Sequence, residues 1–205
     1  SIKRVMDNRS HEKGLLGVVA DIIKVEKKYE TAIETALGGS IQNIVTDNEQ
    51  TAKRMIEFLK KNKFGRATFL PLTQIRSHGG IAQPQALKEE GVIGLADTLV
   101  MVEDKYLELA GSLLGRTLVV DHIDHGLAIA RKYRQSIRIV TLEGDLINPG
   151  GSMTGGAFKN SSNLLSRRRE IEELEQAVQK LRADVAKTEQ EIAELKNNRS
   201  GYYDK

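Results

Sequence analysis

The sequence predicts an α+β fold of two similar lobes, made of small mixed sheets and flanking helices and followed by a coiled-coil helix. Three observations support this prediction. Short apolar runs alternate with amphipathic runs through residues 12–158, as strands alternating with helices do. Two parts of that region share the same order of elements. The last part of the chain carries apolar residues at heptad spacing.

The first lobe, residues 12–72, is expected to contain three strands and two helices. The strands are predicted at Leu15–Ile23, Ile41–Thr46 and Arg66–Leu70, and the helices at Tyr29–Leu37 and Asp47–Asn62. Gly38 and Gly39 suit the end of the first helix, because glycine readily adopts the left-handed conformation found there. Asp47 suits the N-cap of the second helix, because its carboxylate can accept hydrogen bonds from the first free amides.

The second lobe, residues 92–158, follows a long polar connection at residues 73–91. Its strands are expected at Leu99–Val102, Thr117–Val120 and Ile137–Thr141, and its helices at Tyr106–Leu114 and Asp121–Arg134. Each lobe has a leucine–glycine helix end, a strand closed by aspartate (Asp47 or Asp121) and a helix rich in alanine and basic residues. We interpret this as a weak internal duplication, and generic α/β alternation is the alternative.

The final helix shows four consecutive heptads. Its a positions are 171, 178, 185 and 192, and its d positions are 174, 181, 188 and 195. Branched residues at a with mostly leucine at d favour a two-stranded coiled coil. An ordinary surface helix would have a wider apolar face and a period of 3.6 residues. Ser166 is the predicted start of this helix.

Composition narrows the class of protein. About 40% of the 205 residues are hydrophobic, which is enough for a core, and no apolar run approaches the roughly 18 residues of a membrane span. The absence of cysteine excludes disulfides, thiolate zinc sites and cysteine nucleophiles, and it fits a cytoplasmic protein. The net charge of +3 slightly favours anionic partners. We expect neither a membrane partner nor a cofactor.

Five glycines stand in the thirteen residues GDLINPGGSMTGG, residues 144–156. Gly150 and Gly155 have the spacing of a phosphate-binding loop, but Gly156 and Ala157 replace its lysine and its hydroxyl residue. The segment also lacks the last glycine of a nucleophile elbow. Residues 146–151 instead resemble a short edge strand that enters a tight turn and is suited to main-chain pairing with another chain. A flexible loop is the alternative.

The stretch DHIDH, Asp121–His125, invites a metal-site interpretation, because residues three apart on a helix can bring two ligands together. Asp121 follows a strand and precedes a helix, so we favour a capping aspartate and two solvated histidines over a metal site. We identify no catalytic constellation and expect no enzyme activity. A nucleotide- or metal-dependent enzyme on an α/β scaffold is kept as the alternative.

Several motifs in order resemble the hinge domain of the structural maintenance of chromosomes (SMC) proteins, most closely the bacterial homodimeric type. The segment GDLINPGGSMTGG is similar to the glycine motif of that hinge. The stretches ALGGSIQNIV, GRATFLPL and LLGRTLVVD are also similar to it. The resemblance covers residues 12–158 as hinge, residues 160–198 as the start of a returning coiled-coil arm, and residues 1–11 as a stub of the outgoing arm.

This resemblance implies a homodimer in which two hinges pair strands across two interfaces. It implies that ATPase heads lie at the far ends of the arms, so this region should not hydrolyse ATP. The whole protein would be a chromosome-condensing ATPase of the cytoplasmic nucleoid. The interface role is carried over to Gly144, Asn148, Pro149, Gly150, Gly151, Gly155 and Gly156.

The resemblance also implies an antiparallel partner helix for the returning arm. Residues 1–11 are too short to pair with all four heptads. We therefore expect the apolar seam of residues 171–195 to find a partner in another copy or to fray.

DNA binding near the junction of hinge and arm, with a preference for single strands, is the second implied role. The candidates are Lys60, Lys61, Lys63, Lys159, Arg167, Arg168 and Arg169. Basic contacts to phosphate would strengthen binding and steepen its dependence on salt. The alternative is that the lysines complement the dipole of their helix and that the arginines are simply solvated.

Overall fold

The computed structural model describes residues 1–158 and 163–203, which divide after Ser166 into two compact units. The second unit is the continuation of one long helix, α7 (Leu164–Tyr203). The first unit contains the strands and the remaining helices, beginning with α1 (Ile2–Met6), whose Val5 is fully buried. The predicted α+β fold is confirmed, and the first unit is made of two halves with matching topology.

The N-half runs from Leu15 to Pro71 and the C-half from Val92 to Thr154. The N-half contains β1 (Leu15–Val18), α2 (Val19–Ile22), β2 (Lys24–Val25), α3 (Glu30–Leu37), β3 (Ile44–Thr46), α4 (Glu49–Asn62) and β4 (Phe69–Pro71). The C-half contains β5 (Val92–Leu95), β6 (Val100–Met101), α5 (Leu107–Leu114), β7 (Thr117–Val120), α6 (Ile123–Lys132), β8 (Arg138–Thr141), β9 (Leu146–Ile147) and β10 (Met153–Thr154). The connection between the halves contains one short 3₁₀ helix, Pro84–Lys88.

The two sheets repeat one plan. The N-half sheet has the order β1-β3-β4, and the C-half sheet has the order β10-β9-β8-β7-β5. In the N-half, β1 pairs antiparallel with β3, and α4 connects β3 to the parallel strand β4. In the C-half, β5 pairs antiparallel with β7, and α6 connects β7 to the parallel strand β8. Each first strand has a register shift that ends at a glycine, Gly17 or Gly94, with φ of 146° or 159°. The duplication interpreted from the sequence is thus confirmed at the level of topology.

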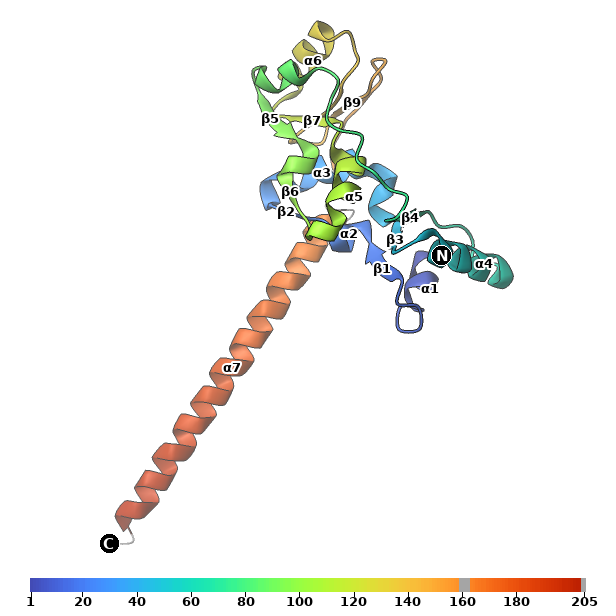
Figure 1. The fold of residues 1–205 in the computed structure, drawn as a ribbon. Coiled ribbons are helices and arrows are strands. Elements are labelled where there is room, and N and C mark those ends of the chain that lie inside the picture. The colour runs from blue at the N-terminus through green and yellow to red at the C-terminus, as the bar shows by residue number, and fades with distance from the viewer. Residues whose placement is uncertain (159–162, 204–205) are drawn as a thin grey trace. The chain divides into compact units, whose positions relative to one another are not determined.

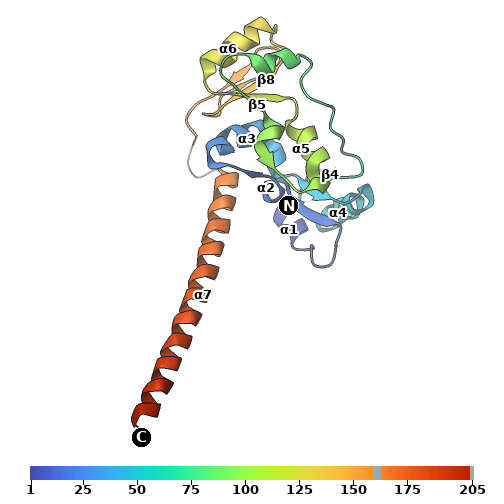
Figure 2. The same ribbon diagram turned by 60° about the vertical axis from the view of Figure 1, so that its left-hand side comes forward.

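The halves are joined by a shared core and a small ribbon. Strands β2 and β6 pair antiparallel across the junction, and α3 and α5 lie between the two sheets (Figures 1 and 2). Buried residues from both halves form one cluster, including Ile33 and Val45 from the first and Leu109 and Val119 from the second. Neither half therefore has a complete core without the other.

Each helical crossover begins with a clasp between an aspartate and the residue four positions later. In the N-half, the Thr51 hydroxyl donates to Asp47 Oδ1 at 2.6 Å. In the C-half, His125 Nδ1 lies 2.6 Å from Asp121 Oδ1. The predicted capping roles of the two aspartates are wrong, because the N-cap positions are one residue later, at Asn48 and His122.

A glycine lies under each clasp. A side chain at Gly14 or at Gly91 would collide with the paired groups of the clasp above it. Each glycine carbonyl also accepts from the amide of the clasp aspartate, at 2.9 Å in both halves. The Asn48 side chain accepts from the amides of Gln50 and Thr51, both at 3.0 Å, and so caps α4 directly.

Three other boundaries differ from the sequence-based prediction. The strand expected at Leu15–Ile23 ends at Val18, where the Val19 amide turns to the Asn43 carbonyl at 3.0 Å and α2 begins. The strand expected at Arg66–Leu70 is β4, which begins at Phe69 and includes Pro71, a residue that an edge strand tolerates. Helix α7 begins before Ser166, and Asn163 Oδ1 accepts from the Ser166 amide at 3.1 Å.

The C-half clasp should make stability depend on pH. The hydrogen bond from Asp121 raises the pKa of His125 above its ordinary value of 6.5, and Glu90 and Asp124 add to this shift. The hydrogen bond to His125 lowers the pKa of Asp121 below 3.8. Because the folded-state pKa of His125 is raised, its stabilising effect is complete below pH 6.5 and is lost as pH rises through the folded value. The effect of Asp121 is present above pH 3.8 and is lost as pH falls through its folded value.

We therefore expect His125→Gln to lower the free energy of urea unfolding more at pH 5.5 than at pH 8.5. The matched control is Thr51→Val, which removes the non-titrating clasp of the N-half and should show no such difference. An equal loss at both pH values for His125→Gln would contradict the assignment.

Candidate functional site

The glycine segment, residues 144–156, forms a hairpin of β9 and β10 joined by a tight turn. The Gly151 amide donates to the Asn148 carbonyl at 3.0 Å, and Gly150 has φ of 87°. Proline at the second position and a glycine with positive φ at the third are the signature of a type II turn. The Gly150 amide also donates to the Gln135 carbonyl at 2.9 Å, which anchors the turn to the end of α6.

The glycines of this segment differ in what surrounds them and in what a larger side chain would contact. Gly144 is buried with φ of 92°, and a side chain there would collide with the Phe158 ring. A side chain at Gly155 would lie 2.6 Å from Asp145 Oδ1. Gly151 and Gly156 also have positive φ, but a side chain at either would reach no atom closer than 4 Å. The requirement at Gly144 and Gly155 is thus met within this chain, and Gly150, Gly151 and Gly156 face open space.

Beside the glycine turn the outer strand of the C-half sheet is β10, not the strand expected at residues 146–151. Strand β9 pairs with β8 on one side and β10 on the other, so it is internal. The segment assignment was correct but the edge was misplaced, because the sequence does not reveal that the chain returns after the turn. Both residues of β10 are exposed, and 53% of the Met153 surface is accessible.

The N-half sheet has the outer strands β1 and β4. Strand β4 pairs only with β3, in parallel. Its side chains are half-buried, and the stretch before it, residues 64–68, has no regular structure. Among the described residues each half-sheet has two outer strands, β1 and β4 in the N-half and β5 and β10 in the C-half, and an outer strand with free backbone groups is a template for pairing with another chain.

The basic candidates Lys60, Lys61 and Lys63 are exposed together at the C-terminal end of α4. Lys63 is the C-cap residue and has φ of 53°, an unusual conformation for a residue with a side chain. Arg4 lies over the Phe64 ring at 5.0 Å, so α1 adds positive charge beside this cluster. Sequence reasoning missed Arg4, because no local pattern places α1 against residue 64.

The other basic candidates lie elsewhere. Lys159 is outside the described residues. Arg167, Arg168 and Arg169 belong to the second unit, and each has an interaction partner. One partner of Arg169 is Glu173, four residues later, at 2.8 Å. The structure therefore groups the lysines of α4 with one another and leaves their placement against the arginines undefined.

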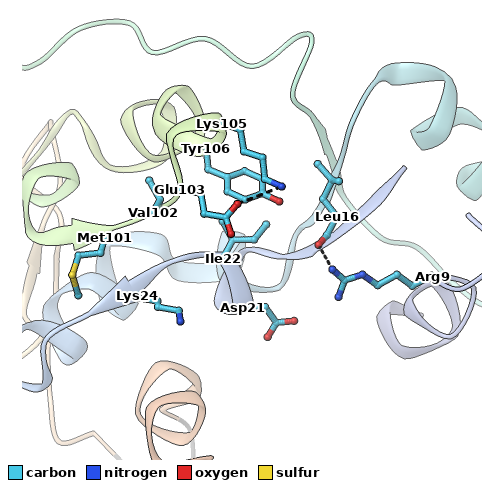
Figure 3. Close-up of a pocket in the computed structure, with 10 residues that line it drawn as sticks. All are labelled: Arg9, Leu16, Asp21, Ile22, Lys24, Met101, Val102, Glu103, Lys105 and Tyr106. Atoms are coloured by element: carbon cyan, nitrogen blue, oxygen red, sulfur yellow. Dashed lines mark hydrogen bonds and ion pairs between the residues drawn. The ribbon is translucent and has the colours of Figure 1, made fainter. Parts of the chain in front are cut away.

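A cleft of about 540 Å³ lies at the junction of β2 and β6 and has charged and apolar walls (Figure 3). Lys105 pairs with Glu103 at 3.4 Å, and Arg9 donates to the Leu16 carbonyl at 2.8 Å. The charge interaction with Tyr106 and the hydrogen bond to Glu103 raise the pKa of Lys105. A lysine that acts as a general base or nucleophile is activated by a lowered pKa, so Lys105 gives the enzyme alternative no support.

The metal interpretation of Asp121–His125 gains no support either. His125 faces Asp121 and, at 3.8 Å, Glu90, whereas His122 is exposed at the N-cap. Within residues 1–158 and 163–203 no group of three or more suitable side chains could hold a metal ion. Over the same residues, no helix combines the length and apolar character needed to cross a membrane.

Comparison with known proteins adds independent information. The family model described as SMC proteins Flexible Hinge Domain matches residues 12–130. The Chromosome partition protein Smc of Bacillus subtilis is 42% identical over 200 residues, which are 96% of this chain and 17% of that protein. The same protein of Desulfitobacterium hafniense is 45% identical over 183 residues, 89% of this chain and 15% of the relative. The chain thus spans less than a fifth of the relatives it matches.

Solved structures agree with the sequence comparison. The asymmetric dimer of the Geobacillus stearothermophilus SMC hinge domain has a TM-score of 0.79 and 37% identity, covering 92% of this chain and 77% of that one. The Pyrococcus furiosus Smc hinge domain with an extended coiled coil has a TM-score of 0.64 and 29% identity, covering 87% of this chain and 64% of that one.

The difference between the crowded position of Gly144 and the open position of Gly150 can be tested by alanine substitution. Gly144→Ala should lower the free energy of unfolding by on the order of 2–3 kcal/mol, because it combines positive φ with a collision against Phe158. Gly150→Ala should cost about 1 kcal/mol, because only the backbone conformation is strained. Urea denaturation of both variants measures the difference. Equal losses would contradict the intrachain role of Gly144.

Proposed function

The chain belongs to the SMC family through its flexible hinge domain, and we propose that it joins two copies of itself into a homodimer. The observation that carries this proposal is that β4 in the N-half and β10 in the C-half are outer strands, each paired on one side within the described residues. A hinge of the same fold is described as a dimer, which supports self-association here. The glycine turn supports it further, because Gly150, Gly151 and Gly156 leave the backbone beside β10 open to approach.

Pairing β4 of one copy with β10 of the other suits a two-fold dimer. Such symmetry repeats the contact, so β4 and β10 of both copies are used and this contact closes on itself instead of extending into a filament. The charges beside the edges are complementary. Lys63 and Arg66 precede β4, whereas Glu143 and Asp145 precede β9 and β10. Opposite charge favours the pairing of unlike edges over the pairing of like edges.

The second unit completes the proposed role as the start of a coiled-coil arm. The apolar heptad residues of α7 remain between 46% and 68% exposed; they are Ile171, Leu174, Val178, Leu181, Val185, Ile192 and Leu195. A helix with such a stripe is suited to pairing with another helix. In the whole protein the hinge would therefore join two arms into a V or ring that organises chromosomes, with ATP hydrolysis outside this region and the protein associated with the nucleoid.

DNA binding is the second function that we propose, at the basic cluster of Lys60, Lys61 and Lys63. These side chains are exposed side by side on the last turn of α4, and Arg4 lies nearby over Phe64. The cluster can neutralise phosphates of either single or double strands, and the preference for single strands stays an expectation from the family resemblance. Arg167, Arg168 and Arg169 are the second candidate group at the base of the arm.

The glycine turn can be tested through self-association. The triple variant Gly150→Ala, Gly151→Ala and Gly156→Ala should be a folded monomer, because methyl groups and altered backbone at these open positions would obstruct pairing at β10. Sedimentation equilibrium across a wide concentration range gives the oligomeric state, and circular dichroism verifies folding. The matched control is Gly79→Ala, which introduces the same kind of strain at φ of 75° in the connection. A triple variant that stays dimeric at nanomolar concentration would rule out this interface.

The basic cluster can be tested without disturbing its helix. We expect Lys60→Gln, Lys61→Gln and Lys63→Gly together to weaken DNA binding and to lower the slope of log affinity against log salt by about 2 for single strands. Glycine at position 63 keeps the left-handed C-cap while removing the charge. Fluorescence anisotropy with single- and double-stranded oligonucleotides at several salt concentrations measures the effect. An unchanged affinity with the dimer intact would move the proposed site to Arg167, Arg168 and Arg169, whose glutamine variants are the comparison.

A further inference from the structure

We propose that the cleft beside β2 and β6 is a docking site for an extended peptide segment of another protein, one that carries an apolar side chain next to an acidic one. We call it the junction cleft. This inference goes beyond the proposed homodimer and DNA binding and depends on neither of them. It rests on an exposed apolar side chain where the internal repeat has a charge, on a cleft of suitable size, and on a cation that forms no ion pair within the described residues.

The junction cleft contains one copy of a short repeat that occurs once in each half. The two copies are KVEKKYE, residues 24–30, and MVEDKYL, residues 101–107. Their first residues, Lys24 and Met101, face each other across the β2–β6 ribbon. In both copies the second lysine or its counterpart pairs with the glutamate two residues earlier, at 3.1 and 3.4 Å, and lies over the ring of the following tyrosine, at 4.8 and 5.0 Å. These shared residues therefore have the same structural role in both halves.

The two copies differ at their ends, where the C-half copy is apolar. Met101 stands where the first copy has Lys24, and Leu107 stands where it has Glu30. Met101 is 60% exposed and Leu107 is 58% exposed. Because the same ribbon accommodates a lysine directly opposite, the fold does not require an apolar side chain at position 101. Exposed apolar surface rimmed by polar residues is typical of sites that bind another molecule.

The junction cleft places Met101 beside deeper apolar side chains. In Figure 3, Tyr106 and Ile22 lie between Met101 on one side and Leu16 on the other. Tyr106 is only 6% exposed, so its ring forms part of the floor. The volume of about 540 Å³ lies within the range of roughly 300–1,000 Å³ found for ligand sites. An apolar ligand side chain can therefore make contacts on both sides of the cleft.

The charges of the cleft leave one cation for the ligand. Glu103 and Lys105 form an ion pair at 3.4 Å, and Asp21 and Lys24 each have an interaction partner. Arg9 donates from Nη2 to a backbone carbonyl of β1 at 2.8 Å, and within residues 1–158 and 163–203 it forms no ion pair. This hydrogen bond holds the guanidinium at one side of the cleft (Figure 3). A guanidinium has further N–H donors whose geometry matches a carboxylate, so an acidic ligand side chain suits this position.

A peptide suits the junction cleft better than a nucleic acid does. Asp21 and Glu103 place two carboxylates on its walls, and these would repel a phosphate backbone. The basic cluster of α4 differs, because no acidic residue stands between Lys60 and Lys63. A peptide backbone is neutral and can pass the two carboxylates, while a single acidic side chain meets Arg9. The apolar and acidic groups of the ligand must therefore be close together along its chain.

Selection from a random heptapeptide library displayed on phage tests the site with the whole chain as target. We expect the selected peptides to carry a large apolar residue beside aspartate or glutamate. In fluorescence anisotropy, Met101→Lys should weaken binding of the most enriched peptide at least tenfold, because it places a charge where the apolar side chain docks. The matched control is Leu87→Lys, which changes a 40% exposed leucine of the connection and should leave the affinity unchanged. Recovery of no peptide, or equal binding to Met101→Lys, would overturn the docking site.

Arg9→Gln tests the acidic group separately, because glutamine keeps a donor for the β1 carbonyl and removes the charge. It should weaken the selected peptide about tenfold and its amide analogue, with asparagine or glutamine in place of the acid, hardly at all. Equal losses for the two peptides would contradict the charge pairing. Urea denaturation verifies folding of the variants, and sedimentation equilibrium measures their self-association.

Two further outcomes would assign the junction cleft to another occupant and so overturn the proposal. Weaker self-association of Met101→Lys, with folding intact, would make the cleft a contact between copies of this chain. Displacement of the peptide by a single-stranded oligonucleotide whose own binding needs Arg9 would make it part of a DNA surface. We expect neither: Met101→Lys should sediment as the unchanged chain does, and the oligonucleotide should leave the peptide bound.

Discussion

The first unit depends on a core that neither of its halves can form alone. Residues of α3 and β3 from the N-half and of α5 and β7 from the C-half pack into one cluster, and β2 pairs with β6 beside it. The inner surfaces of the two halves are therefore buried against each other. Each half-sheet begins with an outer strand, β1 or β5, and ends with another, β4 or β10. The two strands at the far ends, β4 and β10, differ in sequence and in length.

The local sequence limits the free backbone groups of β4 and of β10 in different ways. On β4, proline removes one N–H and the chain turns back immediately, so a single residue, Phe69, keeps outward backbone groups. On β10 the strand has only two residues and follows a glycine turn held to the end of α6. Short edges of this kind limit indiscriminate aggregation, because few register choices exist.

Much of this fold was predictable from the sequence, and the failures have physical causes. Alternation of apolar runs located β3, β7, β8 and the helices between them to within a few residues. The clasps were missed because Asp47 and Asp121 have the chemistry of caps, and only the three-dimensional position of Gly14 and Gly91 decides that the cap is one residue later. The edge at β10 was misplaced because sheet order is a long-range property. The burial of Gly144 was hidden because its contact, Phe158, lies beyond the turn.

The second unit, like the first, presents a surface that is suited to pairing with another chain, but this surface belongs to a helix. An isolated helix in water is marginally stable, and most helical stability in proteins comes from packing an apolar face. Each leucine, isoleucine or valine of the α7 stripe would contribute about 1.5–3 kcal/mol when fully buried, and here they remain about half exposed. The apolar stripe of α7 is suited to pairing with another helix, whereas the outer strands β4 and β10 are suited to pairing with another strand. A partner that fits one of these surfaces therefore does not fit the other. A chain built this way can hold one contact while changing the other, which suits the proposed joint between two arms.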